Sequence, residues 1–117
     1  MFSIEDFIIA VYCCVDDLLK DIIQDYPPPS RGFAPSLTDA EVITMEIVGE
    51  FQGIDTDKGI WEYFKRHWLG LFPHLKTRTT YVRQAGNLWM YKQELQKRLA
   101  SSLGAFSDSI HLVDANQ

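Results

Sequence analysis

The second half of the chain carries a cluster of basic residues that suits the binding of phosphate groups. The basic residues are Lys65, Arg66, Lys76, Arg78 and Arg83. Side chains that can donate hydrogen bonds lie between them: Thr77, Thr79, Thr80 and Gln84. Cationic side chains, hydroxyl groups and the backbone N–H groups at a helix start are the usual donors to nucleic-acid phosphates. The pattern predicts a phosphate-binding surface centred on Lys76, Arg78, Thr79 and Arg83, with Lys65 and Arg66 beside it.

Aromatic residues interleave with these charges and leave two interpretations open. They are Trp61, Tyr63, Trp68 and Trp89. Aromatic side chains can stack on bases or sugars, which favours a nucleic-acid partner. The alternative is a solvated basic face over a core in which most of these rings are buried.

The charge is distributed unevenly along the chain. The net charge of −5 combines an acidic first half with a basic second half. Residues 1–57 contain twelve acidic and two basic residues, whereas residues 58–104 contain nine basic and two acidic ones. An asymmetry of this size indicates an acidic partner, such as nucleic acid, for the basic half.

Other reactive side chains form no recognisable catalytic or metal-binding pattern. Asp16 and Asp17 are adjacent, so on a helix they point about 100° apart. Cys13 and Cys14 are interpreted as buried thiols. The sequence contains no Gly-rich phosphate loop, nucleophilic serine motif or zinc pattern. The histidines lack metal-ligand spacing and are given no role: His67, His74 and His111.

The first two helices are predicted from apolar spacing and from capping residues. Apolar residues at helical intervals predict a helix from about 4 to 25, which Ser3 caps and a run of prolines at 27–29 ends. Thr38 and Glu41 have the spacing of a capping box and begin a second helix. Gly53 is suited to end that helix.

Two further helices are predicted in the basic half. A third helix spans about 57–69, and Gly70 and Pro73 follow it. Thr77 caps a last helix whose apolar period continues to Gly104. Gly86 allows a break within this helix, because glycine costs about 1 kcal/mol relative to alanine there. The residues Ile110 to Val113 then have strand character.

The predicted fold is a compact all-α bundle of four main helices with a short C-terminal strand. The longest apolar run is about half of a membrane span, and the acidic N-terminal residues do not resemble a secretory signal. A cytoplasmic location without membrane contact is therefore expected.

Four segments together resemble the bacterial insertion-sequence transposases of the DDE type. They are Y-C-C-V-D-D-L-L-K at 12–20, P-S-L-T-D-A-E-V-I-T-M-E-I-V-G-E-F-Q-G-I-D-T-D-K-G-I-W-E-Y-F-K-R-H-W at 35–68, R-T-T-Y-V-R-Q-A-G-N-L-W at 78–89 and I-H-L-V-D at 110–114. The long segment is specific, and the resemblance covers nearly all of the chain. It is to the N-terminal portion of such transposases.

The resemblance implies a DNA-binding-type helical domain at 1–106 and the truncated start of an RNase H-like catalytic domain at 107–117. It assigns Asp114 as the first carboxylate of the catalytic triad and, in a complete protein, as a ligand of Mg²⁺ or Mn²⁺. Ala115 follows where the family usually has Gly or another small residue. The second Asp and the Glu of the triad are expected beyond Gln117.

Three hypotheses for the function follow. The leading one is a truncated transposase that binds double-stranded DNA at insertion-sequence ends, without catalysis and without a cofactor of its own. The second is an autonomous helical regulator that binds DNA or dimerises with intact transposase. The third is an interaction bundle, in which the basic surface meets an acidic protein; association with another copy of the chain is also compatible with these hypotheses.

Overall fold

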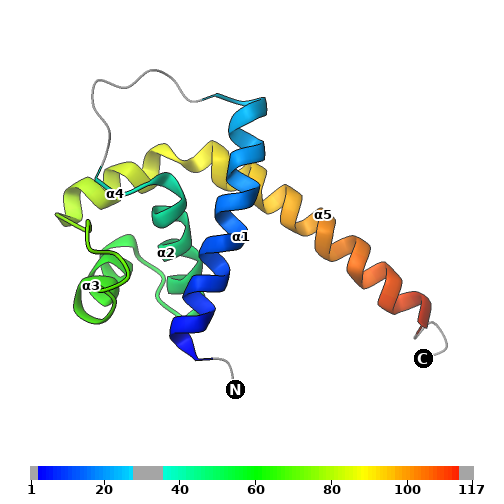
Figure 1. Ribbon diagram of the computed structural model, residues 1–117, viewed down its shortest axis with the longest axis horizontal. Coiled ribbons are helices and arrows are strands. Elements are labelled where there is room, and N and C mark those ends of the chain that lie inside the picture. The colour runs from blue at the N-terminus through cyan, green and yellow to red at the C-terminus, as the bar shows by residue number, and fades with distance from the viewer. Residues whose placement is uncertain (1–2, 28–35, 114–117) are drawn as a thin grey trace.

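The computed structural model describes the backbone of residues 3–27 and 36–113, with side chains as far as Ser101. These residues form five α-helices: α1 (Ile4–Asp25), α2 (Asp39–Phe51), α3 (Asp57–His67), α4 (Arg78–Asn87) and α5 (Trp89–Val113). In Figure 1, α1 lies beside α2, α3 and α4 lie beyond α2, and α5 crosses α1 before extending away from the other helices. The all-α class is therefore confirmed for the described residues.

Helix α1 has the bounds that its sequence predicts. The Ser3 hydroxyl accepts the Asp6 N–H at 3.1 Å and caps the first turn. The buried face repeats at helical intervals through Ile8, Val15, Leu19 and Ile22. Because Cys13 and Cys14 lie off this face, both are exposed, and their interpretation as buried thiols is wrong.

Helix α2 is the central helix and contacts α1, α3 and α4. Its first turn is closed by the predicted capping box, in which the Thr38 hydroxyl accepts the Glu41 N–H at 3.2 Å and Glu41 accepts the Thr38 N–H at 2.9 Å. At the other end, Gly53 has a φ of 84° and donates to the Glu50 carbonyl, while Ile54 donates to the Gly49 carbonyl. These bonds form a Schellman motif, which explains why the helix ends where Gly53 follows.

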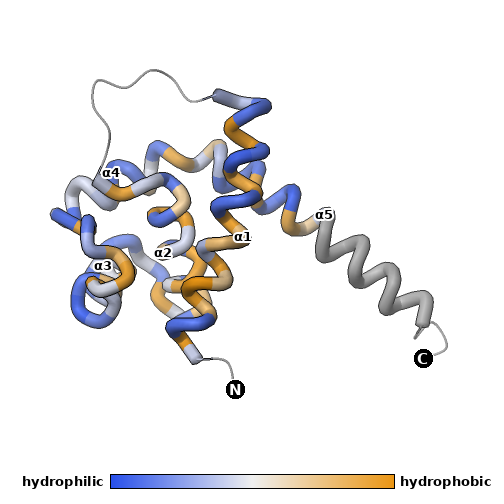
Figure 2. Tube along the Cα trace, in the orientation of Figure 1, coloured by the Kyte–Doolittle hydropathy of each residue, from blue (hydrophilic) through white to orange (hydrophobic). Residues whose placement is uncertain are grey.

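The hydrophobic core lies mainly between α1 and α2 and continues toward α3, α4 and α5. Figure 2 shows that hydrophobic residues are concentrated along α1 and α2, whereas α3 and the start of α4 are more hydrophilic. The side chain of Phe64 on α3 is fully buried and packs edge-on against Phe72, with ring centroids 5.1 Å apart. No helix among the described residues has the length and apolar character needed to cross a membrane.

The last predicted helix is two helices, so the prediction of four main helices is corrected to five. Helix α4 ends at Asn87 and α5 begins at Trp89, with Leu88 between them in a non-helical conformation. Gly86 and Asn87 have low helix propensity, and the buried Leu88 side chain holds the junction in the core. A change of helix direction at this point lets α4 pack on α2 and α3, and α5 on α1.

The predicted strand at Ile110–Val113 is also wrong, because α5 remains helical to Val113. The apolar residues Leu103, Phe106, Ile110 and Val113 recur in the sequence at intervals of three and four, which fits a helix. A helix pairs its own backbone groups, whereas a single strand needs a neighbour that the described residues do not supply. The expected boundary between 106 and 107 falls inside α5.

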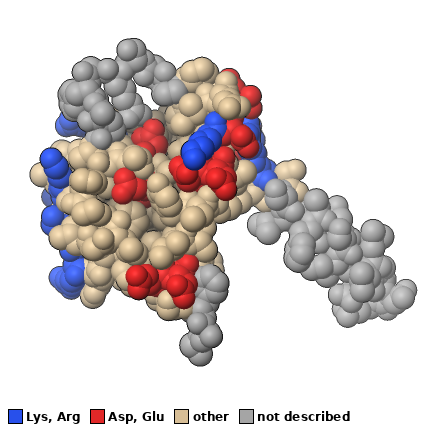
Figure 3. Space-filling model, viewed as in Figure 1, with Lys and Arg blue, Asp and Glu red and all other residues tan. Residues whose placement is uncertain are grey.

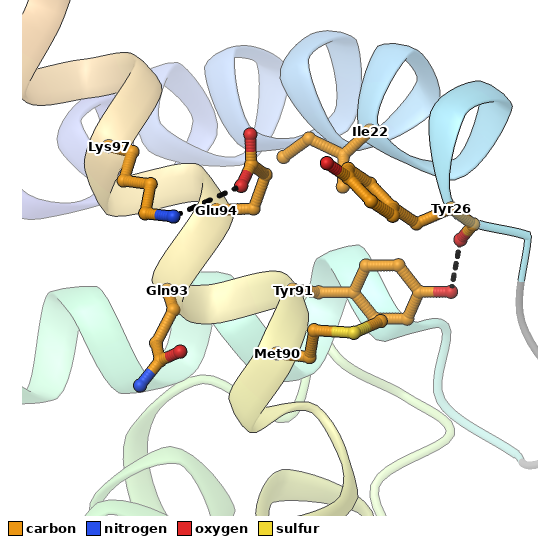
Figure 4. A pocket seen from close by; sticks show the side chains of 7 residues that line it. All are labelled: Ile22, Tyr26, Met90, Tyr91, Gln93, Glu94 and Lys97. Carbon is orange, nitrogen blue, oxygen red and sulfur yellow. Dashed lines mark hydrogen bonds and ion pairs between the residues drawn. The ribbon is translucent and has the colours of Figure 1, made fainter.

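A hollow between α1 and α5 is lined by polar groups that pair with each other (Figure 4). The Tyr91 hydroxyl donates to the Tyr26 carbonyl at 2.7 Å, and Lys97 lies 3.9 Å from Glu94. Nearby, Arg98 is paired with Asp25 at 2.8 Å. The Tyr91 and Arg98 contacts attach α5 to the end of α1, so this region serves the fold.

Two helical glycines provide a matched test of the packing. A Cβ atom added at Gly49 of α2 would lie 2.5 Å from Ile60 Cγ1 on α3, whereas one added at Gly86 of α4 meets no atom within 4 Å. We predict that Gly49→Ala lowers the free energy of unfolding by about 1–3 kcal/mol through overpacking. Gly86→Ala should raise it by up to about 1 kcal/mol through helix propensity.

The measurement is urea denaturation of the two variants and the parent chain, followed by circular dichroism. A Gly49→Ala variant as stable as the parent would show that α2 and α3 do not approach as closely as described.

Candidate nucleic-acid interface

The six residues predicted to bind phosphate lie on three consecutive elements. They are Lys65 and Arg66 in the last turn of α3, Lys76 in the connection, and Arg78, Thr79 and Arg83 on α4. All six are exposed, and α3 and α4 pack against each other. The fold thus brings the predicted residues to one side of the molecule, which we call the α3–α4 basic surface.

The connection between α3 and α4 is held in place by buried side chains and by hydrogen bonds from α3. Phe72 and Leu75 are buried in the core. The Trp61 indole donates to the Lys76 carbonyl at 3.1 Å, and the Lys65 ammonium lies 3.4 Å from the Leu75 carbonyl. These contacts fix the backbone at Lys76, and they give Trp61 and Lys65 a structural role as well.

The first turn of α4 is capped by a neutral side chain and lacks acidic residues. The Thr77 hydroxyl accepts the Thr80 N–H at 3.2 Å and donates to the Thr80 hydroxyl at 2.8 Å. Helices α1, α2 and α3 each have an acidic residue in the first turn, whereas α4, like α5, has none. The positive end of the α4 dipole is therefore not compensated by its own sequence, and this end is suited to an anion.

Ion pairing distinguishes the α3–α4 basic surface from the other described cations except Lys58, which is also without an ion pair among the described residues. Lys20, Lys92, Lys97 and Arg98 each pair with a carboxylate, at distances from 2.8 to 3.9 Å. Within the part of the chain that the structure describes, none of the five cations of the basic surface forms an ion pair. These cations are available to an external anion, since no carboxylate of the described chain neutralises them.

The acidic residues of the first half lie mostly away from this surface. Figure 3 shows Lys and Arg along the edge that α3 and α4 form, at the left, while Asp and Glu gather over α1 and the adjoining part of α2. The asymmetry of charge along the sequence therefore becomes an asymmetry in space. Such a distribution attracts a polyanion to one side and repels it from the other.

Several side chains near the surface differ from their sequence interpretation. Gln84 was expected among the hydrogen-bond donors to phosphate, but it is buried, and its amide donates to the Leu37 carbonyl at 2.9 Å and to Asp39 at 3.1 Å. Trp61, Tyr63 and Trp68 are partly buried against the core. Trp89 alone of these tryptophans is exposed, by 60%.

Val82 was expected in the apolar face of the last helix, but it is 38% exposed on α4. The sequence contains an indication of this, because Tyr81, Ala85 and Leu88 already complete a buried stripe at intervals of four and three. Val82 lies about 100° from Tyr81 around the helix. It is therefore a surface residue beside Arg83.

Two buried ionisable groups near α4 serve the core. Burial raises the pKa of the Tyr81 hydroxyl, and the nearby carboxylates of Glu46 and Asp57 raise it further, so this hydroxyl is neutral. Burial also raises the pKa of Glu46, against the opposing effect of the Lys92 ammonium, which donates to both carboxylate oxygens at 3.1 Å. Lys92 is engaged in this pair and does not extend the basic surface.

Asp114, the carboxylate that the resemblance assigns to catalysis and metal binding, lies outside the described residues. Among the residues that are described, no group of three or more His, Cys, Asp or Glu side chains could hold a metal ion. Comparisons of this chain with protein-family models, with curated proteins and with solved structures found no match.

Proposed function

We propose that this chain binds duplex DNA through the α3–α4 basic surface, as the end-recognition domain of an insertion-sequence transposase. The observation that carries the binding proposal is the set of five unpaired cations on one side of a domain whose other described cations, apart from Lys58, are paired. The assignment to transposition is supported by the resemblance of the four sequence segments. Binding to the DNA ends of an insertion sequence is the activity that agrees with both the basic surface and the sequence resemblance.

The chemistry of the surface favours phosphate over a protein carboxylate partner. It combines three guanidinium groups, the Thr79 hydroxyl and the free N–H groups at the start of α4, and these donors are typical of DNA-backbone contacts. Glu62 is the only acidic residue between Lys58 and Asn87. A surface of this composition can follow several phosphates along a duplex.

The binding should depend strongly on salt. A protein that neutralises about five phosphates releases their counterions, so its affinity should fall by about 10²- to 10³-fold between 50 and 200 mM salt. A neutral hydrophobic interface with a protein partner would not show this dependence.

We predict that Arg78→Ala and Arg83→Ala each weaken duplex binding and reduce the slope of log affinity against log salt by about one unit. Both residues are exposed and unpaired within the described chain, so their removal should leave the fold intact. Fluorescence anisotropy with a labelled duplex at several salt concentrations measures both quantities.

Lys20→Ala is the matched control, because Lys20 is exposed but pairs with Asp16 on α1 at 3.0 Å. It should leave affinity and slope nearly unchanged. If the double variant Arg78→Ala/Arg83→Ala binds as tightly as the parent, with the same salt slope, the α3–α4 surface is not the DNA-binding site.

A separate prediction concerns Asp114. Cleavage of DNA by two metal ions requires several convergent carboxylates. The resemblance assigns only one of these to this chain, so we expect no Mg²⁺- or Mn²⁺-dependent nicking by the purified protein. Asp114→Ala should leave duplex affinity unchanged, since binding is assigned to α3 and α4. Metal-dependent nicking that Asp114→Ala abolishes would contradict this assignment.

A further inference from the structure

Helix α4 exposes one continuous face and buries the opposite one. The buried residues are Tyr81, Gln84, Ala85 and Leu88. The exposed residues include Thr79, Val82, Arg83 and Gly86, which recur at intervals of three, one and three and therefore share a side of the helix. This exposed face belongs to the same helix whose first turn contributes to the α3–α4 basic surface.

The exposed face of α4 is unusual for a face in contact with water. It carries short side chains and an apolar one, together with Arg83, and it has neither an acidic residue nor a lysine. Farther along α5, beyond the exposed Trp89 and Met90 at its start, the exposed positions are Gln93, Gln96 and Lys97. At Gly86 even an added Cβ would meet open space, so the backbone of α4 is bare at this point. Such a helix can approach a partner closely.

The face is rigidly presented. Helices α2, α3 and α4 contact one another in all three pairs. The Gln84 amide bonds to the residues that begin α2, and this fixes the rotation of α4 about its axis. Side chains that already have a fixed orientation in the free protein favour selective recognition. The entropy cost of ordering them arises on folding and does not reduce the binding affinity.

We infer that α4 enters the major groove of duplex DNA and that Arg83 and Val82 read its base sequence. The inference rests on the proposed duplex binding and adds sequence readout to it. A helix with its side chains is about 10–12 Å across, and the major groove is about 12 Å wide. Arg83 would donate two hydrogen bonds to guanine, Val82 would contact a thymine methyl group, and Gly86 would allow the helix to lie close to the bases.

The unpaired cations explain the position of the helix in the groove. Arg78 at the start of α4, Lys76 before it and Arg66 at the end of α3 lie on the elements that flank this face. Contacts of these residues with the phosphates on the two sides of the groove would fix the register of the helix. Base contacts then select the sequence. Substitution of Arg66, Lys76 or Arg78 should therefore weaken binding without changing the preferred sequence. Arg83 belongs to the basic surface and also reads a base, so its substitution should change both the affinity and the preferred sequence.

The test is a selection of duplexes from a random-sequence pool by the full chain, followed by anisotropy on the enriched duplex and a scrambled one. We expect an enriched motif that contains a guanine and a thymine, preferred over the scrambled duplex by at least about tenfold. Arg83→Gln should abolish the preference at the guanine, and Val82→Asn, which replaces the apolar side chain by a polar one, should reduce the preference at the thymine.

Gly86→Gln provides a second, independent variant. The site of the new side chain is open, so the helix content and the thermal midpoint should not fall. The preference for the enriched duplex should nevertheless fall by about tenfold, because the added side chain separates α4 from the bases. Ser101→Gln on the exposed surface of α5 is the control and should leave the preference unchanged.

The outcomes separate this inference from the proposed function. Salt-dependent binding without any enriched motif, or a motif that Arg83→Gln and Val82→Asn leave intact, would overturn base readout and leave phosphate binding in place. Tighter binding to single strands or to RNA duplexes would overturn the groove assignment. Absence of binding to every duplex would overturn both.

Discussion

The buried amide of Gln84 determines how α4 is oriented, and the proposed DNA-binding surface depends on this orientation. The amide donates to the Leu37 carbonyl and to the Asp39 carboxylate, so it joins the middle of α4 to the first turn of α2. Rotation of α4 would leave the buried carbonyl without this donor, at a cost of about 1–3 kcal/mol. The same rotation would turn Arg83 toward the core, where a charge without a partner is still more unfavourable. The packing of α4 and the hydrogen bonds of Gln84 therefore determine which face of α4 points outward.

The domain also separates charge in a way that its fold does not require. The cations on α1 and α5 pair with neighbouring carboxylates, as is usual on a protein surface. Surface pairs of this kind contribute at most about 1 kcal/mol each, so leaving other cations unpaired has little effect on stability. On the proposed function, the arrangement of the cations along α3 and α4 is explained by attraction of an external polyanion, because folding does not require these cations to be paired. That explanation connects the acidic first half of the chain with the basic second half.

Helix starts could be predicted from the sequence because each depends on a local motif. Ser3, Thr38 and Thr77 were all identified as caps, and each accepts a backbone N–H three residues later. Gly86 indicated that the last helix could break nearby, but the division of α4 from α5 also depends on packing in two directions at Leu88, which the local sequence does not specify. Four residues of strand character at 110–113 were misleading, since propensity over so short a stretch is weaker than the helical period of the longer segment. The basic residues were found by type and spacing, but their freedom from ion pairs and the burial of Gln84 are properties of the folded chain.

The start of α4 connects stability with the proposed function. Acidic residues in a first turn stabilise a helix by about 0.3–1 kcal/mol each, and α1, α2 and α3 all have them. Helix α4 begins instead with Arg78, whose charge opposes the helix dipole, and it retains only the neutral cap of Thr77. A phosphate bound at this end would supply the missing negative charge and would accept hydrogen bonds from the N–H groups that Thr77 leaves free. On the proposed function, DNA therefore completes the first turn of α4, and binding stabilises the helix that carries the outward face.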